Sequence, residues 1–362
     1  MKALILAGGF GTRLRPLSCT RPKTLFPIVN RPLLQWIYER LAENDVAEAI
    51  LAVNKQTEWF IKQKKLKKHG LKIRYSSDPL NTPLGTAGPI KRAEKLIGHD
   101  EPFLVLNGDI FADLSYREIL ETHRKRKAVG TIALCEVENP SRYGVAELDR
   151  GNRIKRFIEK PDRGTAPTNF INAGVYVVSP KIFDFIQKGK AVSMEREIFP
   201  QLAQKRVLYG HVTHGLWMDI GKPDEYLKTN KILLDQLFIE RKWQYSGDFT
   251  VRPSVALDNH VTVESRSVVG PYAVLGKGVH IGRGVQIRDS VIFPNVKIGD
   301  SSSIEGAIIG EGASIGKTVK VGRGCIVGDR AKIRDDVLLS EEVAICPGKE
   351  VSENILEPKM LC

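Results

Sequence analysis

The chain has 362 residues, long enough for two domains with hydrophobic cores, and 42% hydrophobic with 27% charged residues is typical of a soluble globular protein. No apolar run reaches the length of a transmembrane helix, which excludes a membrane-spanning protein of the helical class. The net charge of +13 suggests nucleic-acid binding, but neither basic run, 62–69 or 123–127, has interleaved aromatic residues. We therefore expect two solvated, helix-like surfaces and no nucleic-acid partner.

The N-terminal apolar run, residues 3–7, is too short for the core of a signal peptide, so we expect a cytoplasmic protein without a membrane partner. Five cysteines are scattered without a Cys-x-x-Cys pair, so neither a zinc site nor a disulfide framework is expected. His211 and His214 lie in a stretch that reads as a strand, where a structural role is favoured over metal binding.

Short apolar strands alternate with helical patterns through the first two-thirds of the chain. In chain order we expect a strand at 4–7, a helix at 33–44, a strand at 49–53, a basic helix, a strand at 73–75, a helix at 90–96 and a strand at 103–106. This order predicts a Rossmann-like, doubly wound α/β sheet, in which ligands bind beyond the carboxyl ends of the strands.

A glycine loop with two nearby cations follows the first strand. Residues 8–14 read Gly-Gly-Phe-Gly-Thr-Arg-Leu, and glycines without a Cβ let backbone N–H groups approach phosphate oxygens, while Arg13 and Lys23 bring positive charge. A Walker A loop is excluded because no Lys-Ser/Thr pair follows the last glycine, and a dinucleotide fingerprint is excluded because Leu14 replaces a third glycine. An ordinary strand-to-helix turn is the remaining alternative.

The glycine run, the later Pro22-Lys23 pair and residues 217–221, Trp-Met-Asp-Ile-Gly, resemble the signature of sugar-1-phosphate nucleotidylyltransferases. The resemblance covers roughly the first two-thirds of the chain and implies that Arg13 and Lys23 are catalytic. It also implies nucleotide contacts from a set of loop residues: Leu6, Gly8, Gly9, Gly11, Thr12, Gly85, Thr86 and Gly88.

Asp109 follows the apolar strand 103–106 and a glycine, which places a carboxylate at the rim of the expected cleft. Mg²⁺ prefers one or two carboxylates plus phosphate oxygens, although an Asx turn accounts for the same spacing equally well. The family resemblance implies that Asp109 and Asp219 together hold Mg²⁺, which is the expected cofactor.

Two further segments are similar to the mannose-1-phosphate guanylyltransferase branch. Residues 83–89, Pro-Leu-Gly-Thr-Ala-Gly-Pro, face the nucleobase in the family, and residues 193–200 match the same branch, although helix packing explains the second segment as well. GTP and mannose 1-phosphate are therefore the favoured substrates, while dTTP or UTP and glucose or amino-sugar phosphates stay open. The resemblance also implies a sugar-phosphate pocket made by four residues: Gly144, Glu159, Lys160 and Asn172.

The mechanism expected for such a pair of substrates depends on charge. Both substrates are anionic, so the sugar phosphate reaches the α-phosphorus only when repulsion is neutralised and the attacking and leaving oxygens are held in line. The phosphate nucleophile is already ionised near neutral pH, so cations matter more than a general base. We assign Lys23 to the phosphates in transit and Arg13 to the pyrophosphate that leaves.

From Val255 onward, apolar residues recur every six positions, with a second apolar position two residues later and shorter, five-residue steps at Val296 and Ala307. This period predicts a hexapeptide solenoid of roughly five coils, and the family resemblance implies a left-handed parallel β-helix. The expected domains are 1–230, catalytic; 231–250, a helical linker; and 251–362, the β-helix. A helix-like segment at 226–243 is expected to join the catalytic domain to the β-helix. Exposed coil edges favour homo-oligomers.

Three alternatives stay open. Hexapeptide solenoids also serve as acetyltransferases, with His260 or an outward-pointing His280 as a base, so the chain could be bifunctional. A glucose-1-phosphate thymidylyltransferase or uridylyltransferase is the second alternative. A non-catalytic regulatory paralogue is the third, but it should have lost a metal carboxylate or a loop cation, whereas Arg13, Lys23, Asp109 and Asp219 are present.

Overall fold

The computed structural model describes residues 1–362 except 10, 12–13, 79–82 and 241–247. The chain divides into two compact units. The first combines Met1–Gly9 with Leu34–Met218, and the second combines Phe10–Leu33 with Asp219–Cys362. The short N-terminal segment 10–33 is thus grouped with the C-terminal part of the chain.

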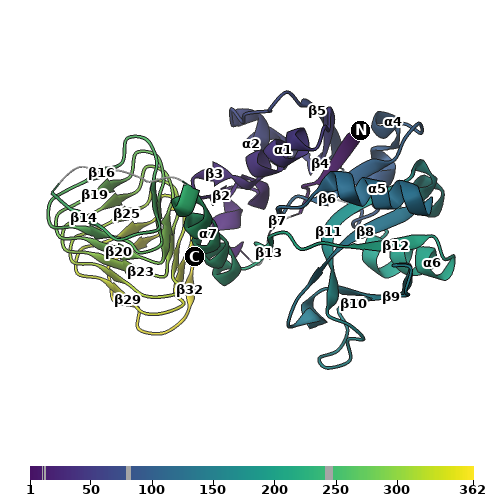
Figure 1. The fold of residues 1–362 in the computed structure, drawn as a ribbon. Coiled ribbons are helices and arrows are strands. Elements are labelled where there is room, and N and C mark those ends of the chain that lie inside the picture. Colours follow the sequence, from purple (N-terminus) through teal and green to yellow (C-terminus); the bar gives the residue numbers. More distant parts are fainter. Residues whose placement is uncertain (10, 12–13, 79–82, 241–247) are drawn as a thin grey trace. The chain divides into compact units, whose positions relative to one another are not determined.

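A nine-stranded mixed sheet forms the centre of the first unit, in the order β10-β9-β11-β6-β1-β4-β5 with β8 and β12 continuing from β11 (Figure 1). The strands β1, β4, β5 and β6 run parallel, whereas β11 is antiparallel to β6. The bounds are β1 (Lys2–Leu6), β4 (Glu48–Asn54), β5 (Lys72–Asp78), β6 (Phe103–Asn107), β8 (Gly130–Glu136), β9 (Gly144–Leu148), β10 (Ile154–Glu159), β11 (Phe170–Val178) and β12 (Leu208–Val212).

The central strand β1 is apolar from Ala3 to Leu6 because both faces of a parallel sheet are covered, and Ala3, Leu4 and Ile5 are fully buried. The predicted order of strands and helices is confirmed for this part of the chain. The helical segments are α1 (Leu33–Glu43), α2 (Lys55–Gln63), α3 (Gly88–Arg92), α4 (Glu94–Ile97), α5 (Tyr116–Arg126), η4 (Pro140–Arg142), η5 (Pro180–Phe185), the π-helical turn η6 (Met194–Ile198) and α6 (Phe199–Gln204).

One expected helix is shorter than predicted. The helix α2 ends at Gln63, and Lys64 is extended, with φ −90° and ψ 126°, so most of the basic run 62–69 is not helical. Consecutive lysines repel one another and offer no apolar face that could pack, which explains the early end. The second basic run lies in α5 as predicted, and Lys127 caps that helix in the left-handed conformation.

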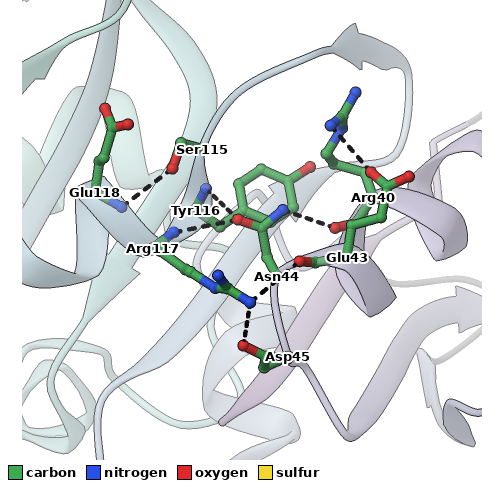
Figure 2. A network of polar contacts seen from close by, with 8 residues as sticks. All are labelled: Arg40, Glu43, Asn44, Asp45, Ser115, Tyr116, Arg117 and Glu118. Atoms are coloured by element: carbon green, nitrogen blue, oxygen red, sulfur yellow. Dashed lines mark hydrogen bonds and ion pairs between the residues drawn. The ribbon is translucent and has the colours of Figure 1, made fainter.

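The end of α1 is fastened to the start of α5 by one buried amide. The Asn44 side-chain oxygen accepts hydrogen bonds from the backbone N–H groups of Tyr116 and Arg117, which have no partner within α5 (Figure 2). Ser115 caps the same helix by accepting from the N–H of Glu118. The two helices therefore hold a fixed relation at the edge of this unit.

The second unit contains three parallel sheets, in which each strand pairs with strands of the neighbouring coils. These strands are two or three residues long. The first contains β14 (Thr250–Val251), β17 (Val268–Val269), β20 (Gln286–Arg288), β23 (Ser303–Glu305), β26 (Lys320–Val321) and β29 (Leu338–Leu339). The second contains β15 (Val255–Leu257), β18 (Ala273–Leu275), β21 (Ser290–Ile292), β24 (Ile308–Ile309), β27 (Ile326–Val327), β30 (Ala344–Ile345) and β32 (Met360–Leu361). The third contains β16 (Thr262–Val263), β19 (His280–Ile281), β22 (Lys297–Ile298), β25 (Ser314–Ile315), β28 (Lys332–Ile333) and β31 (Glu350–Val351).

This stack confirms the predicted fold class, since it is consistent with a left-handed parallel β-helix that follows the α/β sheet. His280 pairs with Thr262 in the preceding coil, whereas the next pair, His280 with Lys297, is one residue closer in sequence, which reflects the five-residue step. The sheets have six, seven and six strands, so the stack is taller than the five coils expected. The repeated Val, Ile, Leu and Ala positions form one continuous core.

The helix α7 (Pro223–Glu240) lies at the predicted position before the β-helix, and the remaining residues of the predicted helix fall outside the described part. None of the helices that the structure describes is both long and apolar enough to cross a membrane. The structure contains one disulfide that was not predicted from the sequence, between Cys346 and Cys362. The pairing of β30 with β32 brings these two cysteines into adjacent coils, a register that sequence spacing did not show.

Candidate functional site

The carboxyl ends of four parallel strands meet at one edge of the sheet in the first unit. Leu6 at the end of β1 is in register with Asn107 of β6, and Asn54 at the end of β4 is in register with Asp78 of β5. Gly8 follows at this edge, and a Cβ added there would lie 3.2 Å from Asp78 Oδ2. A side chain at Gly8 would therefore crowd the Asp78 carboxylate, so glycine leaves room for this carboxylate at the edge of the sheet.

Asp78 was not identified from the sequence. Its Oδ1 is buried without a hydrogen-bond partner in the described structure, and burial raises the pKa of this carboxyl to about 6, although Arg92 opposes the shift. No local motif marks this aspartate, because its environment comes from the glycine loop, whose Gly8 lies seventy residues earlier (78 − 8).

We expect Asp78→Asn to stabilise the protein above pH 6. The folded-state pKa is raised above the unfolded value, so the folded state binds the proton more tightly, and stability falls as pH rises from about 4 through about 6. After discounting for partial exposure, removing this penalty should raise the free energy of unfolding by about 1 kcal/mol at pH 7.5. Thermal unfolding at pH 5 and pH 7.5 measures the difference. Asp100→Asn, at an exposed position, is the control, and an equal response of both variants would contradict the assignment.

The segment predicted to face the nucleobase is held by close backbone contacts. Gly85 has a φ of +69°, and a Cβ there would lie 2.3 Å from the carbonyl oxygen of Val192. The N–H of Ala87 donates to the same oxygen at 2.9 Å, and a Cβ at Gly88 would lie 2.6 Å from Leu84 Cβ. Both glycines are thus required by the local packing. Residues 79–82, which precede this segment, lie outside the described residues.

Thr86 joins the two segments that resemble guanylyltransferases. Its hydroxyl donates to Glu195 Oε2 at 2.6 Å and accepts from the N–H of Met194 at 2.8 Å. Ser193 Oγ donates to the same carboxylate oxygen at 3.0 Å. Met194, Ile198 and Phe199 are buried, so this turn also packs the core as the alternative interpretation expected. The polar partner of Thr86 was missed because it is 109 residues away in sequence.

Gly144 and Glu159 of the predicted sugar-phosphate pocket are register partners on β9 and β10. A Cβ at Gly144 would lie 2.4 Å from Phe157 Cζ and 3.0 Å from Glu159 Oε2, so glycine leaves room for the carboxylate. Burial raises the pKa of Glu159, with a further contribution from the Glu195 carboxylate, while Lys160 lowers it. Lys160 Nζ lies 3.4 Å from Glu159 Oε1. Glu159 and Lys160, both predicted pocket residues, therefore form an ion pair, and Glu159 lies beside Gly144.

Asn172 lies at an irregularity in β11. Its Nδ2 donates to the Tyr176 hydroxyl at 2.9 Å, and its Oδ1 accepts from the N–H of Gly174 at 2.8 Å. Tyr176 is fully buried, which raises its pKa well above the usual value, and it also hydrogen-bonds Asn107 at the end of β6. Trp217 Nε1 donates to the carbonyl of Ala173 at 2.9 Å. Asn172, one of the predicted sugar-phosphate residues, is thus connected through Tyr176 to Asn107 at the carboxyl edge of the sheet.

Gly11 and Lys23 belong to the second unit and contact each other. Gly11 has a φ of +57°, and a Cβ there would lie 2.9 Å from Lys23 Cγ. Lys23 is the first residue of the short helix η3 (Lys23–Leu25), which follows η2 (Leu17–Cys19). Lys23 is 7% exposed. The aliphatic stem of this lysine therefore packs against Gly11. Thr12 and Arg13, the other predicted residues here, lie outside the described residues.

The two predicted metal ligands flank a pair of short strands. Asp109 precedes β7 (Ile110–Ala112), Asp219 ends β13 (Trp217–Asp219), and β7 pairs with β13. Asp219 Oδ1 accepts from the N–H of Gly221 at 2.8 Å. Within the described ranges, no group of three or more His, Cys, Asp or Glu side chains could hold a metal. Two carboxylates completed by substrate phosphate oxygens suit Mg²⁺, which usually keeps few protein ligands.

Comparison with known proteins agrees with the predicted architecture. Residues 2–236 match the nucleotidyl transferase family model, and residues 251–361 match the GMPPB C-terminal domain model. The chain is 42% identical over 242 residues to mannose-1-phosphate guanyltransferase 2 from Candida glabrata, covering 66% of each protein. It is 37% identical over 274 residues to mannose-1-phosphate guanylyltransferase 1 from Arabidopsis thaliana, covering 75% of each.

A solved structure is similar as well. HddC from Yersinia pseudotuberculosis, complexed with GMP-PN, matches with a TM-score of 0.55 and 30% identity, over 64% of this chain and 99% of that one. The alignment to the Candida glabrata relative spans about two-thirds of that protein's length, 66%. The family expected from the glycine loop and the downstream motifs is confirmed, and the chain belongs to the nucleotidyl transferase family.

Proposed function

We propose that this protein transfers a guanylyl group from GTP to mannose 1-phosphate in a Mg²⁺-dependent reaction that yields GDP-mannose and pyrophosphate. The contact of Thr86 with Glu195 carries the proposal, because it joins the two segments that resemble guanylyltransferases. The names of the relatives at 42% and 37% identity support the same nucleotide and sugar, and the complex of HddC with GMP-PN supports the nucleotide.

Each part of the site has a role in this reaction. Backbone groups of the first loop bind the phosphates, the segment 85–88 faces the base, and the sugar phosphate lies near Glu159 and Lys160. The full set of proposed contacts is Leu6, Gly8, Gly9, Gly11, Thr12, Gly85, Thr86 and Gly88 for the nucleotide, and Gly144, Glu159, Lys160 and Asn172 for the sugar phosphate.

The chemistry is an in-line displacement at the α-phosphorus. A phosphate oxygen of the sugar phosphate forms the new bond to phosphorus as the bond to the bridging oxygen of pyrophosphate breaks. Lys23 and Arg13 neutralise the charge that develops, and the ionised nucleophile needs no base. Asp109 and Asp219 would hold Mg²⁺, which supplies positive charge to the phosphates when bound.

A substrate panel tests the proposal. Pyrophosphate release is measured with GTP, ATP, UTP and dTTP, each combined with mannose 1-phosphate or glucose 1-phosphate. We expect kcat/KM to be highest for GTP with mannose 1-phosphate, by about 10²-fold or more over dTTP, because a site that hydrogen-bonds one base leaves buried groups unpaired with another. A preference for dTTP or UTP with glucose 1-phosphate would contradict the proposed substrates, and no release with any pair would favour a regulatory paralogue.

The acetyltransferase alternative gains no support from the β-helix. His280 is exposed as predicted, with Nδ1 2.8 Å from Thr262 Oγ1 and Nε2 3.4 Å from a carboxylate oxygen of Glu264. Surface pairing accounts for these contacts. His260 is exposed too, in a left-handed turn between strands. Self-association and the cytoplasmic location stay predictions.

A further inference from the structure

One buried ion pair links the signature segment to the β-helix. Arg21 Nη2 lies 2.5 Å from Asp329 Oδ2 and 2.9 Å from Glu311 Oε2, and the Thr20 hydroxyl donates to the same Asp329 oxygen at 2.6 Å. The side chains of Arg21 and Asp329 are 12% and 7% exposed. The guanidinium carbon also lies 5.0 Å from the centre of the Phe293 ring. These contacts all belong to the second unit.

The architecture of the β-helix explains the contact of only one of the two carboxylate oxygens of Asp329, Oδ1. Asp300, Asp329 and Asp335 each use Oδ1 to accept a backbone N–H of the preceding coil, at 3.0, 2.8 and 2.8 Å. These bonds satisfy turn amides and recur along the solenoid. Asp335 is exposed, whereas Asp329 is buried and directs its second oxygen at Thr20 and Arg21. At this coil position the aspartate side chain accepts a hydrogen bond from a turn amide, and Asp329 in addition binds Thr20 and Arg21.

Lys23 lies between this ion pair and a second anchor. Pro22 fixes the backbone between Arg21 and Lys23, and the N–H of Phe26 donates to the carbonyl of Lys23 at 2.9 Å. The Phe26 ring packs edge-on against Tyr226 of α7 at 5.9 Å and against Phe293 at 6.1 Å. Lys23 is thus held from both sides by residues that are themselves fastened to the C-terminal part of the chain.

We propose that Asp329 is a positioning residue for nucleotidyl transfer: by holding Arg21 it sets the position of the Lys23 ammonium group. This inference rests on the proposed role of Lys23. It gives the β-helix a part in catalysis within the same chain, besides the self-association expected from the sequence. An electrostatic contact to a transferred phosphate is sensitive to displacement, so loosening the anchor should lower kcat more than it changes substrate binding.

Asp329→Asn tests the inference, because asparagine keeps the Oδ1 acceptor for the turn but loses the charge opposite Arg21. We expect kcat to fall about 10-fold or more, with KM for mannose 1-phosphate within about threefold. Hydrogen exchange of the amides in residues 17–33, measured without substrate, should become faster. Asp335 occupies the equivalent turn position but lies outside this contact, so Asp335→Asn should leave kcat, KM and the exchange of residues 17–33 unchanged.

Two further variants keep the test informative if Asp329→Asn folds poorly. Thr20→Val removes one donor to Asp329 and should shift kcat and exchange in the same direction by a smaller factor. Arg21→Met should lower kcat and speed exchange as Asp329→Asn does. The double variant Arg21→Met with Asp329→Asn should have the same kcat as Arg21→Met alone, because both changes break the same Arg21–Asp329 interaction. Additive losses in the double variant would overturn the proposed link.

Unchanged exchange in Asp329→Asn would overturn the anchor, and faster exchange with an unaltered kcat would overturn its effect on Lys23. A wild-type protein that releases no pyrophosphate with any nucleotide and sugar phosphate would instead overturn the proposed function, since the exchange measurement needs no substrate. The two failures are therefore distinguishable.

Discussion

Lys23→Met is expected to lower kcat for GDP-mannose formation by about 10²- to 10³-fold, the loss typical for removing one preorganised electrostatic contact to a transition state. Methionine retains an apolar stem that packs beneath Gly11, so the loop should stay in place. Because Lys23 is nearly buried, the midpoint of thermal unfolding is measured beside the rate, which separates a loss of catalysis from a loss of folding. Pyrophosphate release at saturating GTP and mannose 1-phosphate measures the rate.

Lys297→Met, an exposed lysine on the β-helix, is the matched control and should retain wild-type kcat. If Lys23→Met keeps kcat within about threefold of wild type while folding normally, Lys23 does not act on the phosphates. A loss of kcat with a lower thermal midpoint would indicate that the ammonium group also stabilises the fold, because methionine keeps the apolar stem.

Asp219→Asn is expected to reduce kcat by about 10²-fold at 1 mM Mg²⁺ and to raise the Mg²⁺ concentration needed for half-maximal rate. Asparagine still offers an oxygen to the N–H of Gly221, so the turn after β13 should persist and the effect should come from the lost charge. Asp109→Asn should behave in the same way, since both carboxylates are proposed to hold one ion. The readout is the dependence of pyrophosphate release on Mg²⁺ concentration.

Direct binding of Mn²⁺ in the presence of GTP, followed by electron paramagnetic resonance, separates metal affinity from activity. The exposed Asp184→Asn variant is the control and should bind Mn²⁺ like the wild type. An Asp219→Asn variant with wild-type metal affinity would contradict its role as a ligand, whatever its kcat. Restoration of activity by excess Mg²⁺ would support that role.

Periodic features were predictable from the sequence because each coil or strand repeats the same physical requirement. The six-residue period marked the inward positions of the β-helix. The five-residue steps appear in the structure as paired residues that are one position closer in sequence. The apolar strand at the N-terminus was similarly predictable, because local sequence determines it. The basic run after α2 was predicted wrongly because charge density, rather than propensity, ends that helix.

Contacts between distant residues could not be predicted in this way. Thr86 and Glu195 are joined across 109 residues, and the pKa of Asp78 is raised by burial that no local motif shows. Cys346 and Cys362 meet only because the last strand pairs with β30. For a single sequence, such contacts depend on the completed fold. The roles of the site residues stay predictions that the variants above address.

The contact of Arg21 with Asp329 also constrains how the protein matures on the ribosome. The two residues are separated by 308 positions, and at about 5 to 20 residues per second the arginine waits roughly 15 to 60 s for its partner to be synthesised. The ion pair that anchors the stretch carrying Lys23 can therefore form only after nearly the whole polypeptide has been synthesised. Exchanging the C-terminal coils for those of a solenoid without this aspartate would remove the partner of Arg21 and Thr20 and leave the stretch without this anchor.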